Sequence, residues 1–206
     1  MMRAALFTLA LIAAPAAAQE GPQPVLAEGE SVEVELRADL NGDGVADLAY
    51  VAAKAEESRE LRVATSFVGE VGTGENPVQV LPLDPYPLGD ATLEVKGNVL
   101  LFKELTGGTT ALSSTYRFRW DAKLEAMRLI GLDATLYSRT FAHDGVEASW
   151  NLLTGDLVTR TLKLNTGSGD QAYNPVGEKK TKRSFPPLRL EDSPRPEGIL
   201  PYPEPN

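Results

Sequence analysis

The stretch D-L-N-G-D-G-V-A-D-L-A-Y, from Asp39 to Tyr50, decides how the rest of the chain is interpreted. Side chains with oxygen atoms recur along it, and Gly42 and Gly44 allow a curl tight enough to turn those oxygens toward one centre. A hard cation such as calcium takes roughly six to eight oxygen ligands. The pattern predicts one calcium ion, held by the side chains of Asp39, Asn41, Asp43 and Asp47 and by the carbonyl of Val45.

The sequence on either side of this loop predicts strands. The loop opens like an EF-hand loop, but its twelfth residue is Tyr50, where an EF-hand needs a bidentate Glu. Residues 31–37 alternate apolar and polar side chains, and residues 48–53 form a short apolar run. We therefore expect strand, loop, strand. A simpler interpretation is compatible with this one, since Asn-Gly and Asp-Gly are also strong hairpin-turn signals.

Residues 33–51 resemble the D-x-N-x-D-G-x-x-D calcium loop of FG-GAP and VCBS-type repeats, at the ligands, at both glycines and in the apolar strand that follows. The resemblance implies that Asp47 is a direct ligand in place of the missing Glu. The sequence contains no second copy of the motif, and repeat folds need several units. We therefore expect a single compact β domain with one such loop, rather than a propeller.

The N-terminus predicts secretion. Residues 1–18 carry Arg3, an apolar run and an Ala-Ala-Ala end, which is typical of a cleaved signal peptide. The apolar run is too short to span a bilayer, so we expect no stable membrane insertion after cleavage, and a periplasmic or extracellular location. The chain has a net charge of -9 and no cysteine. The charge argues against nucleic acid as a partner, and no disulfides are expected to stabilise the fold.

Short apolar or alternating runs separated by turn signals follow the loop and predict an all-β antiparallel meander or sandwich. Residues 19–30 are expected to be a flexible lead-in, residues 31–192 one β-rich domain, and residues 193–206 an extended Pro-rich tail. Leu188 and Leu190 suggest one edge strand before the tail. Only residues 52–60 suggest a brief helix. The expected strands cover residues 61–68, 78–83, 91–95, 99–105, 115–120, 127–132, 147–152 and 157–164.

A wider resemblance rests on packing residues. The segments S-T-Y-R-F-R-W (114–120), L-I-G-L-D (129–133), W-N-L-L-T-G (150–155) and P-L-R-L-E-D (187–192) occur in that order. This order resembles a loosely defined group of secreted bacterial proteins in which a β domain follows one VCBS-like loop. The turn at residues 121–125 is longer than in that group, and Leu132 stands where an aromatic residue is common. The resemblance implies a fold and no chemistry.

Few residues here suit catalysis. His143 is the one histidine, and a Ser-His-Asp hydrolase would need it together with Asp144 and a serine, but no G-x-S-x-G motif is present. The serines weighed for that role are Ser113, Ser114 and Ser149. One histidine and no cysteine leave a zinc site without its usual ligands. A glycosidase needs two carboxylates, whose positions spacing does not reveal. The acids weighed for that role are Glu104, Asp121 and Glu147.

Two tryptophans and a basic run are the candidate binding features. Trp120 and Trp150 could stack on a ligand, although each stands in an alternating pattern that favours core packing. The cluster at residues 179–183 is expected on a solvated polar loop. We expect a calcium-stabilised domain that binds an unidentified protein or glycan, without catalysis. The alternatives are a secreted carboxylate-dependent polysaccharide hydrolase and a purely structural envelope component.

Overall fold

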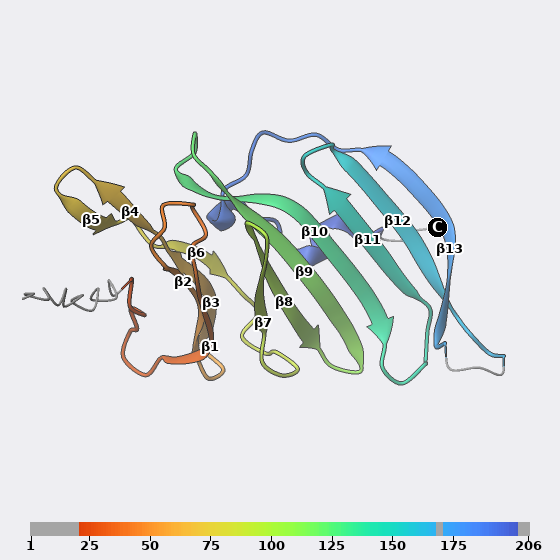
Figure 1. Cartoon of the computed structure of the whole chain (residues 1–206). Coiled ribbons are helices and arrows are strands. Elements are labelled where there is room, and N and C mark those ends of the chain that lie inside the picture. Colours follow the sequence, from red (N-terminus) through yellow and green to blue (C-terminus); the bar gives the residue numbers. More distant parts are fainter. Residues whose placement is uncertain (1–20, 168–170, 202–206) are drawn as a thin grey trace, which may run out of the picture.

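The chain folds into antiparallel β-sheets, with no α-helix in the part that the structure describes. The structure is a computed structural model that describes residues 21–167 and 171–201. Its strands form a four-stranded sheet, a seven-stranded sheet and a separate hairpin (Figure 1). The all-β class that the turn spacing predicts is confirmed. The expected signal peptide, residues 1–18, lies outside the described residues.

The smaller sheet carries the loop. Its strands lie in the order β1-β2-β3-β6 and are β1 (Ser31–Ala38), β2 (Asp47–Lys54), β3 (Ser58–Ala64) and β6 (Gln79–Pro82). The expected helix at residues 52–60 is wrong, because Ala52 and Glu60 pair across a β2–β3 hairpin. Its turn residue Glu56 has a φ of 60°, in the left-handed region. Pairing of β2 with strands on both sides overrides the weak helical signal.

A hairpin leaves the sheet between β3 and β6. It consists of β4 (Ser66–Gly69) and β5 (Gly72–Glu75), and it projects to one side of the molecule (Figure 1). The strand expected at residues 61–68 is therefore two strands, with the break at Thr65. Asn76 stabilises the chain at this break, since its backbone N–H donates to the Thr65 carbonyl at 2.8 Å and its Nδ2 donates to Thr65 Oγ1 at 3.0 Å.

The larger sheet is a meander in which each strand pairs with its neighbours in sequence. Its strands are β7 (Thr92–Lys96), β8 (Val99–Gly107), β9 (Thr110–Asp121), β10 (Ala126–Ser138), β11 (Gly145–Asn151), β12 (Asp156–Leu164) and β13 (Tyr173–Lys182). The seven strands curve around one face (Figure 1). The basic residues 179–182, expected on a loop, belong to the edge strand β13.

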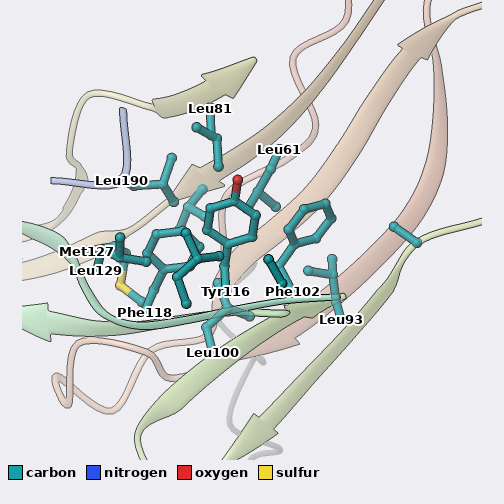
Figure 2. Close-up of a cluster of buried hydrophobic side chains, with 14 of the residues drawn as sticks. Leu61, Leu81, Leu93, Leu100, Phe102, Tyr116, Phe118, Met127, Leu129 and Leu190 are labelled. Atoms are coloured by element: carbon teal, nitrogen blue, oxygen red, sulfur yellow. The ribbon is translucent and has the colours of Figure 1, made fainter. Parts of the chain in front are cut away.

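One hydrophobic core joins the two main sheets. Alternating side chains of β8, β9 and β10 pack against Leu61 and Leu81 from the smaller sheet. Figure 2 shows these two leucines facing Phe102, Tyr116 and Phe118. The Tyr116 and Phe118 rings are nearly parallel, with centroids 5.9 Å apart. The alternation that predicts the strands thus also provides the inner face of the larger sheet.

A buried cluster of charges also joins the sheets. Arg59 on β3 is 3% exposed, and it donates from Nε to Glu33 Oε2 at 2.6 Å and from Nη1 to Glu104 Oε2 at 2.7 Å. Burial raises the pKa of Glu104. Burial is also the largest single effect on Glu33, but the hydrogen bonds from Arg59 and from the Ala91 N–H, together with the Arg59 charge, outweigh it and lower the pKa of Glu33. The paired guanidinium and carboxylates link β1 and β3 to β8.

The C-terminal segment lies against the core as far as residue 201. It contains two short 3-10 helices, η1 (Leu190–Asp192) and η2 (Pro196–Ile199), which contact β6, β10 and β11. Leu190, Ile199 and Leu200 are buried, and Leu190 lies beside Met127 and Leu129 (Figure 2). The extended tail expected from residue 193 is therefore not seen in residues 193–201. Residues 202–206 lie outside the described residues.

The described part of the lead-in runs along the smaller sheet. Tyr50 Oη donates to the Val25 carbonyl at 3.2 Å and accepts the Val25 N–H at 3.0 Å. Arg62 donates to the same carbonyl and to both carboxylate oxygens of Glu30. Residues 21–30 are thus held by side chains of β2 and β3. Across residues 21–167 and 171–201, no helix is long and apolar enough to cross a membrane.

Candidate functional site: the Asp39–Tyr50 loop and the groove beside it

The loop joins β1 to β2 at one end of the smaller sheet. Ala38 and Asp47 are the last paired residues, so the loop proper spans residues 39–46. Gly42 and Gly44 both have a φ of +86°, and a Cβ at either position would meet no atom within 4 Å. These glycines are required for backbone conformation rather than for space. The tight curl that the sequence predicts is therefore present.

Side-chain oxygens organise the inside of this curl. Asp39 accepts the N–H groups of Gly42 at 2.6 Å and Gly44 at 2.9 Å. Asn41 Oδ1 accepts the Asp43 N–H, and Asp43 Oδ1 accepts the Val45 N–H. Each of these oxygens has a second lone pair beyond its recorded N–H partner. The loop therefore keeps oxygen donors of the type that calcium prefers.

Asp47 differs from the other candidate ligands because it is fully buried and saturated. Its Oδ2 accepts the N–H groups of Leu40 and Asn41, and its Oδ1 accepts both the N–H and the Oγ–H of Ser66. Burial raises the pKa of Asp47, and these four hydrogen bonds offset part of that rise. To ligate an ion directly, Asp47 would have to give up at least one of them.

Ser66 is one of the residues of this site that the sequence does not predict. Its backbone and hydroxyl bind Asp47, its Oγ lies 3.2 Å from Asp43 Oδ2, and its carbonyl accepts the Asn41 Nδ2 donor at 2.6 Å. Ser66 begins β4, so these contacts fasten the base of the β4–β5 hairpin to the loop. The one sequence signal is the polar pair Thr65-Ser66 after an apolar strand, which predicts a break but not its partner.

The donor set suits calcium chemically, although the acids do not converge. Within the described ranges, no group of three or more His, Cys, Asp or Glu side chains is placed to share a metal. Asp47 faces Ser66, whereas Asp39 faces the loop glycines. A calcium ion would therefore depend on the amide oxygen of Asn41, on the Val45 carbonyl and on water besides Asp39 and Asp43.

A groove of about 520 Å³ adjoins the loop. One wall is the loop itself, another is the base of the hairpin, and the far side is the β9–β10 end of the larger sheet. The lining side chains combine two aromatic rings, amides and carboxylates. They come from Asn41, Asp43, Ser66, Phe67, Val68, Asn76, Trp120 and Glu125, with Gly42 between them.

The two tryptophans occupy different environments. Trp150 is 2% exposed, its Nε1 donates to the Arg183 carbonyl, and Phe185 packs edge-on against it. Core packing is therefore its role, and stacking on a ligand is excluded in this conformation. Trp120 is half-buried, packs partly on the core and lines the groove. Of the two candidate stacking residues, only Trp120 remains available.

The histidine does not form a triad. His143 Nε2 lies 2.9 Å from Thr110 Oγ1, and its Nδ1 lies 2.6 Å from the Asp144 carbonyl oxygen. The Asp144 carboxylate instead pairs with Lys163, and Ser149 donates to Asp133. His143 lines an apolar hollow of about 490 Å³ that Leu136, Val146 and Leu200 also border.

The three acids weighed for a glycosidase are paired with arginines. Glu104 binds Arg59, Asp121 binds Arg128 and Glu147 binds Arg160. Glu104 borders a hollow of only about 40 Å³, far below the roughly 300 Å³ at which ligand pockets begin. These pairings do not favour the hydrolase alternative.

Comparison with protein-family models, with curated proteins and with solved structures finds no match.

Proposed function

We propose that this protein is a secreted, periplasmic or extracellular binding domain in which one calcium ion stabilises the loop beside the binding groove. Asp39, Asn41, Asp43 and the Val45 carbonyl would hold the ion. Asp47 would hold it too if it released one of its internal donors. The ion stabilises the loop, and the binding partner occupies the groove.

One observation carries this proposal. Two of the proposed ligands, Asn41 and Asp43, contact Ser66 at the base of the β4–β5 hairpin. The same two residues line the groove with Phe67 of the hairpin and Trp120 of the larger sheet. An ion that fixes Asn41 and Asp43 would therefore fix one wall of the groove. Pre-ordered walls favour binding because less freedom is lost when the ligand arrives.

The expected stabilisation is large enough to measure. An ion present at about a hundred times its dissociation constant adds about 2.7 kcal/mol to the free energy of unfolding. For a chain of this length, that raises the melting temperature by about 5 to 10 °C. We expect this rise when calcium replaces a chelator in thermal unfolding of the purified protein.

Asp43→Ala should abolish the rise, because it removes a proposed ligand from the middle of the loop. Asp90→Ala is the matched control, since Asp90 is an exposed aspartate outside the loop, and it should keep the full rise. If the melting temperature of the unaltered protein is the same with calcium and with chelator, residues 39–47 form a turn and the calcium proposal is wrong.

A further inference from the structure

We infer that the groove binds an uncharged polysaccharide chain, with one sugar ring stacked on the Trp120 indole. This inference rests on the proposed function, because the groove is the binding face that the loop would stabilise. It names the ligand class, which the proposed function leaves open. The residues that carry it are Trp120, Phe67, Asn76 and Glu125, and none of them is a proposed calcium ligand.

The lining of the groove matches the two kinds of surface on a sugar ring. A pyranose has an apolar C–H face and an edge of hydroxyl groups, so it needs an aromatic ring and hydrogen-bonding groups close together. Trp120 and Phe67 provide the rings. Asn76 and Glu125 provide oxygen acceptors for hydroxyl donors. Since neither belongs to the loop, these acceptors remain when an ion is bound.

Parts of this surface are already ordered. A Cβ at Gly74 would lie 2.4 Å from Cζ of Phe67, so the Phe67 ring lies directly over this glycine on the opposite strand. Asn76 Nδ2 donates to Thr65 Oγ1 and to the Ser66 carbonyl, which orients the amide. Ordered side chains lose little rotamer freedom on binding, which suits a weakly interacting, uncharged ligand.

The charge of the groove selects against other ligands. Its lining includes the carboxylates of Asp43 and Glu125 and no Lys, Arg or His. An anionic polysaccharide or a nucleic acid would meet like charge there. A basic peptide would meet opposite charge, but Asp43 is a proposed calcium ligand, and Glu125 is exposed, where ion pairs contribute little in salt. Stacking and neutral hydrogen bonds therefore favour an uncharged sugar chain.

The test measures binding of cellohexaose, maltohexaose, xylohexaose and N-acetylchitohexaose to the purified protein by calorimetry and tryptophan fluorescence. Pentalysine serves as the basic-peptide probe. We expect at least one of the neutral oligosaccharides to bind and to change the fluorescence. Trp120→Ala should weaken that binding by about tenfold or more, equivalent to about 1.4 kcal/mol. Trp150→Phe is the matched control and should keep the affinity, because Trp150 is buried elsewhere.

Phe67→Ala provides a second variant, since Trp120 packs partly on the core and its removal could unfold the protein. Phe67 is 46% exposed, so its loss should weaken sugar binding while leaving the melting temperature nearly unchanged. The inference is wrong if no neutral oligosaccharide binds, if Phe67→Ala and a folded Trp120→Ala both keep the affinity, or if pentalysine binds in the groove instead.

Failure here is distinguishable from failure of the calcium proposal. Each binding measurement is paired with thermal unfolding in calcium and in chelator. A calcium-dependent melting temperature without sugar binding would leave the proposed stabilisation intact and overturn the ligand class. Sugar binding that depends on Trp120, without any effect of calcium on melting, would support the ligand class and overturn the role of the ion.

Discussion

Asp47 and Asp43 show how two residues of one motif can differ in role. Asp43 lies at the surface of the loop and lines the groove. Asp47 is buried and accepts four hydrogen bonds from Leu40, Asn41 and Ser66. A buried carboxylate with every acceptor position filled stabilises the fold directly, because without it the N–H groups of Leu40, Asn41 and Ser66 would be left unpaired. Asp47 is therefore an anchor of the fold with or without an ion.

Asp47→Asn should destabilise the protein by about 3 kcal/mol, because an amide N–H₂ would face donors that now bind a carboxylate oxygen. We expect the loss to be similar in calcium and in chelator. Chemical denaturation in both conditions measures it, with Asp90→Asn at an exposed site outside the loop as the control. A loss confined to the calcium condition would show that Asp47 acts only as a ligand.

The edge strand β13 shows how alternation organises charges at the scale of an element. Lys180 and Lys182 lie two residues apart and both pair with Asp156 on β12, at 3.5 and 2.9 Å. The Lys182 ammonium, with the Thr154 hydroxyl and Lys180, lowers the pKa of Asp156 to about 2. Lysines on an exposed edge also discourage pairing with other chains. The basic cluster is thus part of the sheet.

The pairing of β13 should weaken in acid. Because the folded pKa of Asp156 lies below its ordinary value of 3.8, its contribution is present above about pH 4 and is lost as the pH falls toward 2. We expect hydrogen-exchange protection of the β13 amides to fall over this range relative to those of β9. Asp156→Asn should remove most of this pH dependence. If the pH profile of Asp156→Asn equals that of the unaltered protein, the pH dependence arises from other groups.

The two main sheets are held together by apolar packing and by one buried arginine. The core cluster draws on both sheets and on the C-terminal segment. Within it, Arg59 connects Glu33 on β1 with Glu104 on β8. Replacing one member of a buried ion cluster leaves the charges of the other members unpaired. The resulting loss of stability is larger than the net stabilisation that the intact cluster provides. Arg59 is therefore expected to be sensitive to substitution at the junction of the sheets.

Arg59→Met should destabilise the protein by about 3 to 5 kcal/mol at neutral pH. The loss should shrink as the pH falls, because burial already raises the pKa of Glu104 and protonation removes its unpaired charge. Urea unfolding at several pH values measures this. Arg117→Met, at a half-exposed ion pair with Asp133, should cost less than about 1 kcal/mol. Equal losses in the two variants would contradict a special role for Arg59.

The sequence by itself determined most of the strands, the turns and the curled loop, because these depend on neighbouring residues. Alternating side chains predict β1 and β9, a short apolar run predicts β8, and the glycines at 42 and 44 predict the positive φ values of the loop. A local sequence signal does not show whether a strand will pair with neighbours on both sides or will lie at the edge of a sheet. For this reason the sequence suggests a helix at residues 52–60 and a loop at residues 179–183, where the structure has strands over residues 52–54, 58–60 and 179–182.

Only the tertiary structure decided which candidate residues meet. Ser66 lies 19 residues from Asp47, and Arg59 lies 45 residues from Glu104, so no local spacing predicts either contact. The same applies to the groove, since it forms where the loop, the hairpin and the larger sheet come together. Trp120 and Trp150 stand in similar alternating patterns, but only Trp120 lies at that junction. Core packing sets where whole strands and loops lie, and this placement decides whether a tryptophan ring is buried or lines the groove.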